Sequence, residues 1–200
     1  MTATPLPDDG FAEQGLTDFL LTVDDLEVMV EAGVFARDDA KRVELVEGKL
    51  VRMSPESMPH SRAAARLNKA IDRAIERLGL DQTFEVLNGG TVRITDTSAF
   101  DPDGAVIARD AEGFFMRADQ VFLIIESSLA TLRRDLGSKS RAYAAAGIAE
   151  YWVIDIKNAR LHVFRTPVDG AWSESSTFGV GDLVSPLFAP GADIPLTSVF

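Results

Sequence analysis

Apolar residues recur at helical spacing in the second quarter of the chain. The four-four-three spacing of one apolar stripe predicts a helix over residues 60–78, which ends at Gly79. The stripe consists of Leu67, Ile71, Ile75 and Leu78. A second helix is expected from about 135 to 146, ending at Gly147, and the capping-box pattern over 22–25 predicts a short helix near the N-terminus.

Runs of apolar and β-branched residues predict a sheet between and after these helices. Residues 42–53 are typical of a hairpin that turns at Glu47-Gly48. The run 121–126 lacks polar alternation, as expected of a central strand covered on both faces. Further strands are expected at 83–87, 91–95, 104–108, 150–156, 160–165 and 172–178. This order indicates an α/β protein with a mixed sheet flanked by helices, closed by an irregular strap from Ser185.

Composition restricts the class of protein further. The length of 200 residues suits a single domain, which we place at 22–200 after a flexible lead-in over 1–21. The chain has no apolar run near the ~20 residues that span a bilayer and no secretory pattern, so the cytoplasm is the expected compartment. The absence of cysteine excludes thiolate metal sites and leaves carboxylates as the natural ligands of Mg²⁺. The net charge of −11 argues against tight phosphate binding unless basic residues gather locally.

Two carboxylates are placed at the ends of expected strands. Asp103 lies in the turn 101–104, directly before an apolar strand, where it is either an ordinary turn residue or a side chain aimed at the sheet edge. Glu126 follows five apolar residues, and it either emerges into solvent or is paired or bound to a metal ion.

A lysine and a third carboxylate complete the candidate chemistry. Asp135, Lys139 and Tyr143 are spaced four apart and share one helix face, so Lys139 either pairs with Asp135 on the surface or reaches the strand ends. Glu44 lies among apolar neighbours in the hairpin and is either exposed or part of the site. Carboxylates that hold Mg²⁺ beside a lysine are what phosphodiester hydrolysis requires.

Nearly the whole chain resembles the Uma-type putative restriction endonuclease family of the PD-(D/E)XK nuclease superfamily. The matching segments are RVELVEGKLVRMSP (42–55), His60, DPDGAVIARD (101–110), LIIESS (123–128), RRDLGSKSRAYAAAGIAEYWVID (133–155) and GDLVSPLFAPGADIPLTSVF (181–200). The resemblance implies a restriction-endonuclease-like core, Mg²⁺ or Mn²⁺ as cofactor, DNA as substrate and a homodimer.

The same resemblance implies an active-site set of Glu44, Asp103, Glu126 and Lys139, in which Asp103 and Glu126 bind metal and Glu44 assists. In the basic pattern of the superfamily the lysine lies two residues beyond the acidic residue, where this chain has Ser128; the resemblance moves that role to Lys139 on the following helix. Ser127 departs from the apolar residue common in the family.

Nucleic acid would contact a basic strip on the helix 60–78. The strip lies opposite the apolar stripe and contains Arg62, Arg66, Lys69, Arg73 and Arg77. The alternative is a solvated helix face. His60 precedes the strip and is either a phosphate contact or a capping or packing residue, the interpretation we favour. Tyr151-Trp152 is expected in the core or in a dimer interface, and His162 is expected to be structural.

Three functions are compatible with these residues. The favoured one is an endodeoxyribonuclease. The second is a catalytically silent binding or accessory protein of the same fold, which the acidic charge supports. The third is a glycosidase with a Glu/Asp pair, which gives Lys139 no role.

Overall fold

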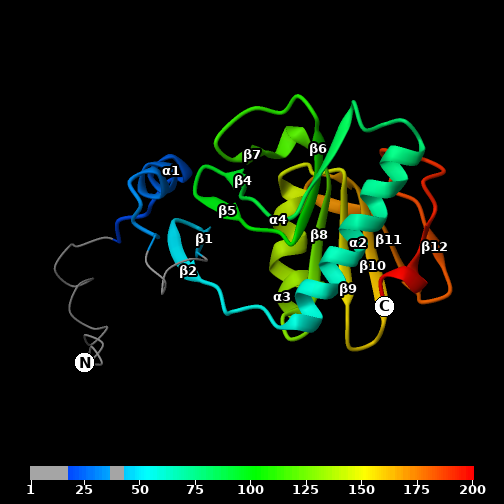
Figure 1. The fold of residues 1–200 in the computed structure, drawn as a ribbon. Coiled ribbons are helices and arrows are strands. Elements are labelled where there is room, and N and C mark those ends of the chain that lie inside the picture. The colour runs from blue at the N-terminus through cyan, green and yellow to red at the C-terminus, as the bar shows by residue number, and fades with distance from the viewer. Residues whose placement is uncertain (1–17, 37–42) are drawn as a thin grey trace.

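The computed structural model describes residues 18–36 and 43–200, which form two main sheets with helices packed against them (Figure 1). The larger sheet has six strands in the order β11 (Ala171–Gly179), β10 (Arg160–Val168), β9 (Glu150–Asp155), β8 (Val121–Ser128), β6 (Gly104–Ala108) and β3 (Phe84–Leu87). The smaller has five in the order β2 (Lys49–Arg52), β1 (Val43–Val46), β5 (Ser98–Phe100), β4 (Val92–Thr95) and β7 (Met116–Arg117). The predicted fold class is confirmed.

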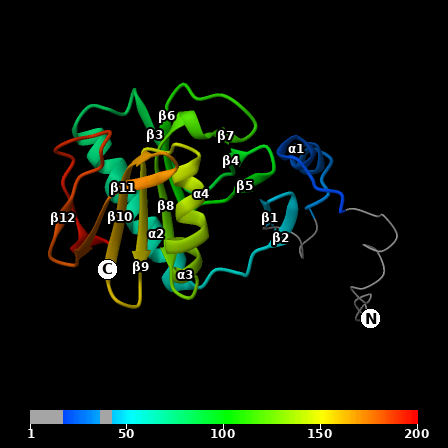
Figure 2. The ribbon, with the colours of Figure 1, turned by 180° about the vertical axis from the view of Figure 1, so that it is seen from behind.

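Helices cover both faces of the six-stranded sheet. Helix α2 (Met58–Arg77) lies on the face seen in Figure 1, and the helices after β8 lie on the face seen in Figure 2. These are α3 (Leu132–Arg134), the π-helical segment η3 (Asp135–Lys139) and α4 (Ser140–Ala145), which follow one another without a break. Short 3₁₀ turns occur at η2 (Ala118–Gln120) and η4 (Leu196–Ser198).

Strand β8 is the centre of the core, as its unbroken apolar run predicts. Side chains alternate along a strand, so Leu123 and Ile125 pack with Ile71 of α2 while Ile124 packs with Tyr143 of α4. The strand pairs antiparallel with β6 and parallel with β9. Tyr151 and Trp152 of β9 are completely buried inside the chain, so the expected core position is confirmed and the alternative position of this pair, in a dimer interface, is wrong.

The five-stranded sheet packs against helix α1 (Val23–Glu31). Thr22 begins this helix with the predicted capping box, in which its hydroxyl accepts a hydrogen bond from Asp25 N and the Asp25 carboxylate accepts one from Thr22 N. The predicted hairpin is confirmed as β1 and β2, and its residue Leu45 packs with Val23 and Leu26 of α1. Residues 1–17 of the expected lead-in lie outside the described residues.

The structure differs from the sequence prediction in several elements. Helix α2 begins two residues earlier than expected because Pro59 is accommodated in its first turn, where the missing amide hydrogen costs nothing. Strands β5 and β7 are too short to give a pattern, and the second helix begins before residue 135. The strap after Ser185 is partly regular, since β13 (Ile194–Pro195) pairs with β12 (Leu183–Val184). Among residues 18–36 and 43–200, no helix combines the length and apolar character that crossing a bilayer requires.

Candidate active site

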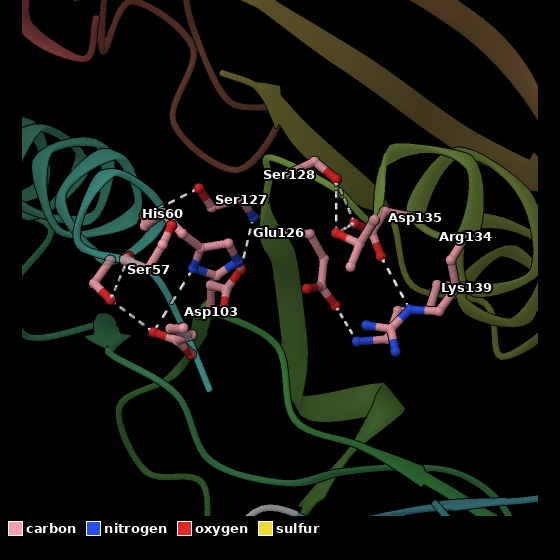
Figure 3. A network of polar contacts seen from close by, with 12 residues as sticks. Ser57, His60, Asp103, Glu126, Ser127, Ser128, Arg134, Asp135 and Lys139 are labelled. Carbon is pink, nitrogen blue, oxygen red and sulfur yellow. Dashed lines mark hydrogen bonds and ion pairs between the residues drawn. The ribbon is translucent and has the colours of Figure 1, made fainter. Parts of the chain in front are cut away.

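Strand pairing brings Asp103 and Glu126 to the same edge of the six-stranded sheet. Gly104 of β6 is opposite Ile125 of the antiparallel strand β8. Asp103, which precedes Gly104, is therefore a neighbour of Glu126, which follows Ile125. Two hydrogen bonds fix Asp103: its carboxylate accepts one from Ser127 N at 2.7 Å, and its carbonyl accepts one from the buried Asn68 amide at 3.0 Å. Figure 3 shows both carboxylates at this edge.

Glu44 reaches the same place from the five-stranded sheet. Glu44 and Leu45 are both buried on the short strand β1, and because successive side chains point to opposite faces, Leu45 packs on α1 while Glu44 points the other way. The Glu44 side chain accepts a hydrogen bond from Asp101 N at 3.3 Å. Only 2% of Glu44 is exposed, so the alternative of an exposed position is wrong.

Lys139 joins these carboxylates. Its Nζ atom lies 2.8 Å from Glu44 Oε1 and 2.7 Å from Glu126 Oε1, and Tyr143 donates a hydrogen bond to the same oxygen of Glu126 at 3.0 Å. Both Lys139 and Asp135 are buried, so the alternative of an Asp135–Lys139 pair on the surface is wrong. A buried amine between two carboxylates is the geometry that such a low-dielectric position requires.

The π-helical segment η3 sets the position of Lys139, its last residue. A π turn holds one residue more than an α turn and leaves backbone groups that need other partners. Here the Tyr151 hydroxyl donates to the carbonyl of Asp135 at 3.1 Å, and Trp172 Nε1 donates to the carbonyl of Ser140 at 3.0 Å. At the start of the segment the Ser128 hydroxyl donates to the Asp135 carboxylate. Side chains from three strands therefore stabilise both ends of the turn.

Burial and charge act in opposite directions on these groups. Burial raises the pKa of Glu126 to about 7, against the effect of Lys139 and with that of the neighbouring Asp103 charge. Burial also opposes the charge of Lys139, but the Glu126 and Glu44 carboxylates outweigh it and raise the pKa of the amine to about 12. Lys139 is therefore a permanent cation, which suits a role in holding negative charge and excludes one as a general base near neutral pH.

An open pocket of about 330 Å³ contains the site. Asp103, Glu126 and Lys139 line it together with the backbone loop that precedes α2. Sequence reasoning missed further charged residues that line it, among them Arg52, Glu56 and Arg134. The alternation of Arg52 with the apolar residues of the hairpin could have indicated that Arg52 lies near the site. No spacing in the sequence connects Glu56 or Arg134 with Asp103.

His60 lies in this pocket. We expected a capping or packing residue, but its Nε2 atom lies 3.3 Å from Asp103 Oδ2 and its carbonyl accepts a hydrogen bond from the Ser127 hydroxyl. Figure 3 places Glu126 between His60 and Asp103 on one side and Lys139 on the other. His162, which we expected to be structural, lies 3.1 Å from the Thr177 hydroxyl on the neighbouring strand.

The residues of the basic strip on α2 do not share one environment. Arg66 donates a hydrogen bond to the oxygen of the C-terminal Phe200 at 3.0 Å. Lys69, Arg73 and Arg77 line, with Arg66, a second pocket of about 300 Å³ against the C-terminal strap. Arg62 is exposed and contacts the sulfur of Met58. The structure brings His60 to the carboxylates, and the strip itself lines a separate surface.

The donor set fits a divalent cation. The Asp103 charge is close enough to Glu126 to raise its pKa, so two carboxylates repel one another at this edge. Among the described residues, both hydrogen bonds that Glu126 accepts go to Oε1, and its side chain lines the pocket. Oxygen donors of this kind are the preferred ligands of Mg²⁺ and Mn²⁺.

A mixed sheet flanked by helices, with one carboxylate directly before β6, another within the neighbouring strand β8 and a buried lysine from the next helix, defines the class of restriction-endonuclease-like proteins. The chain belongs to the Uma2 family, whose model, described as "Putative restriction endonuclease", matches residues 25–197.

A solved structure shares this fold. The crystal structure of "a putative nuclease belonging to DUF820" from Anabaena variabilis is similar with a TM-score of 0.66 at 17% identity, over 90% of this chain and 97% of that one. The type IIG restriction endonuclease BpuSI gives a TM-score of 0.41 at 16% identity, over 67% of this chain and 16% of that chain. No curated protein matches the chain.

Proposed function

We propose that this chain is a divalent-metal-dependent endonuclease that hydrolyses DNA phosphodiester bonds. One observation carries the proposal: the Lys139 amine lies within hydrogen-bonding distance of Glu44 and Glu126, at 2.8 Å and 2.7 Å, in the pocket that also contains Asp103. Membership in a family whose model is described as "Putative restriction endonuclease" supports DNA as the substrate class.

Asp103 and Glu126 would hold Mg²⁺ or Mn²⁺, with Glu44 assisting. A bound divalent ion supplies Lewis-acid polarisation of a phosphoryl oxygen and lowers the pKa of water. Asp103 is preorganised for this role by Ser127 N and Asn68, which fix both its side chain and its backbone.

Lys139 would orient the attacking water or stabilise the negative charge that develops on the phosphate. Its pKa of about 12 keeps the amine charged at neutral pH, and Glu44 prevents it from swinging away from the pocket. Preorganised charge of this kind commonly contributes a factor of roughly 10²–10³ to the rate of hydrolysis.

Cleavage of supercoiled plasmid and of single- and double-stranded oligonucleotides, in Mg²⁺ or Mn²⁺, tests the proposal. Asp103→Ala and Lys139→Met should abolish cleavage, and chelation of the metal should do the same. Asp110→Ala removes an exposed carboxylate near the other end of β6 and should leave the rate unchanged. Absence of cleavage by the folded protein on all DNA and RNA substrates, or cleavage that survives Asp103→Ala, would sink the proposal.

The second candidate is a catalytically silent binding or accessory protein of the same fold. The net charge of −11 favours it, because phosphate binding usually requires a positive surface. This candidate predicts saturable binding of nucleic acid or protein that is indifferent to metal, whereas metal-dependent turnover would exclude it.

A further inference from the structure

Three metal-ligating side chains gather beside Glu126 on the side away from Lys139. One ligand atom from each of Glu56, His60 and Asp103 lies within 4.8 Å of the other two. Glu56 comes from the loop before α2, His60 from the first turn of that helix, and Asp103 from the turn before β6. Figure 3 shows the His60 ring beside Asp103.

Each nitrogen of the His60 ring has a carboxylate beside it. Nε2 lies 3.3 Å from Asp103 Oδ2, and Nδ1 lies 3.7 Å from Glu56 Oε2. One ion can bind only one of the two ring nitrogens, because they point in different directions. Two atoms bound to one metal at about 2.1 Å, with an angle of about 110–120°, lie about 3.4–3.6 Å apart, which is close to the distance between Nδ1 and Glu56 Oε2.

One nitrogen of the His60 ring also has no hydrogen-bond partner in the described part of the chain. Nδ1 is shielded from solvent and makes no hydrogen bond there, although the ring is held between two carboxylates. A buried ring nitrogen without a partner costs free energy unless something else binds it. The amine of Lys139 cannot serve here, because it lies between Glu44 and Glu126 on the other side of the pocket.

We propose that Glu56, His60 and Asp103 bind a divalent transition metal, and that the imidazole makes this site select Mn²⁺ or Zn²⁺ over Mg²⁺. Imidazole is a ligand of transition metals, whereas Mg²⁺ favours oxygen ligands and keeps several of its waters. Asp103 belongs both to this cluster and to the proposed nuclease site. Binding of a metal ion by the cluster does not depend on the proposed function; only a role for that ion in hydrolysis rests on it.

Histidine NMR gives a direct test, since the chain has two histidines. In protein labelled with ¹⁵N on the imidazole rings, the diamagnetic ion Zn²⁺ should shift one ring nitrogen of His60 strongly. His162, on β10, should keep its spectrum and serves as the internal reference. A His60 spectrum that does not respond to Zn²⁺, or equal responses of both histidines, would overturn the proposal.

Calorimetric titration with Mn²⁺ and with Mg²⁺ gives the matching test of selectivity. His60→Ala and Glu56→Gln should each weaken Mn²⁺ binding by about tenfold or more. His60→Ala should change Mg²⁺ affinity by no more than about twofold, because it removes no oxygen ligand, whereas Glu56→Gln removes a carboxylate and should weaken the binding of both ions. Equal weakening of both ions by His60→Ala, or no change for Mn²⁺ in either variant, would contradict the site; His162→Ala is the control.

Neither readout needs turnover, so the two proposals fail separately. A protein that binds Mn²⁺ through His60 and cleaves nothing refutes the nuclease and keeps this metal site. A protein that cleaves DNA in Mg²⁺ while His60→Ala binds Mn²⁺ normally refutes the metal site and keeps the nuclease. Glu56→Gln changes an exposed residue, so it reports on the site even if His60→Ala fails to fold.

Discussion

Lys139 Nζ lies 2.8 Å from Glu44 Oε1, a contact between residues that are 95 positions apart and belong to different layers of the fold. Glu44 is on the five-stranded sheet, whereas Glu126, the other partner of Lys139, is on the six-stranded sheet. The amine therefore connects the two sheets at the pocket. Because Lys139 contacts a carboxylate on each sheet, the geometry of the site depends on how the two sheets pack against each other.

Lys139→Met should consequently destabilise the metal-free protein. It leaves the buried carboxylate of Glu126 without its counter-charge and Glu44 with Arg134 alone, at 3.8 Å, and removal of one partner of a buried pair costs roughly 3 kcal/mol. The free energy of unfolding, measured by urea denaturation in the presence of a chelator, checks this expectation. Lys157→Met, at an exposed turn position, is the matched control and should change the stability by less than about 0.5 kcal/mol.

The same interaction predicts that the loss is recovered when the carboxylates are neutralised. Adding Glu44→Gln and Glu126→Gln to Lys139→Met removes the uncompensated charge, so the triple variant should be more stable than Lys139→Met alone. Equal stabilities of the two variants would mean that Lys139 acts through packing rather than through charge.

Both tyrosines of the chain should resist ionisation in the folded state. Burial, with a further contribution from the Glu126 charge, raises the pKa of Tyr143 and of Tyr151 well above the ordinary value, and the chain has no other tyrosine. Because the folded state keeps these protons more firmly than the unfolded state, stability should fall as the pH rises above about 10. Ultraviolet titration should show tyrosinate appearing together with alkaline unfolding. Ionisation of either phenol while the circular dichroism remains native would contradict this.

Strand patterns predicted the acidic part of the site because apolar runs are local features of the sequence, although β8 continues two residues past Glu126, which we expected at its end. The position of Asp103 before β6 and that of Glu126 in β8 follow from apolar runs that the structure contains. Lys139 was a candidate from its four-residue spacing, but the π-helical turn that sets its position is stabilised by Tyr151 and Trp172, which come from strands later in the chain.

Residues held only by tertiary contacts were beyond prediction. Glu56 lies in a loop and Arg134 in a helix end, and each joins the pocket through packing that no periodicity encodes. The burial of Glu44 has the same origin, since a four-residue strand gives no indication of which face a second sheet will cover. His60 looked like a packing residue because its partners lie in the loop before the helix and in the turn before β6.

Gly104→Ala should damage the site without touching its charged groups. A Cβ atom at Gly104 would lie 2.3 Å from Oδ1 of Asn68, whose amide holds the Asp103 carbonyl. Asn68 is buried in α2 and must move, so we expect a loss of about 1–3 kcal/mol in unfolding free energy. Any cleavage activity should fall by more than the smaller amount of folded protein explains, because Asp103 moves with Asn68. Gly181→Ala, where no atom lies within 4 Å of the new Cβ, is the control.

The face that contacts nucleic acid can be located by comparing Arg52 with Arg73. Arg52 lines the pocket of Asp103 and Glu126, whereas Arg73 lines the separate pocket against the C-terminal strap, and both side chains are exposed. If DNA enters at the carboxylates, Arg52→Ala should weaken binding and lower the slope of log affinity against log salt by about 1, as expected for one lost phosphate contact.

Arg73→Ala removes the same charge from the chain, so it controls for net charge and should leave that slope unchanged. Both variants are best measured in an Asp103→Ala background, where binding can be followed by fluorescence anisotropy without cleavage. The opposite result, in which only Arg73→Ala lowers the slope, would assign DNA to the basic strip of α2. Since that strip lines a surface separate from the carboxylates, DNA bound there would have to bend or extend around the first turn of α2 to be cut.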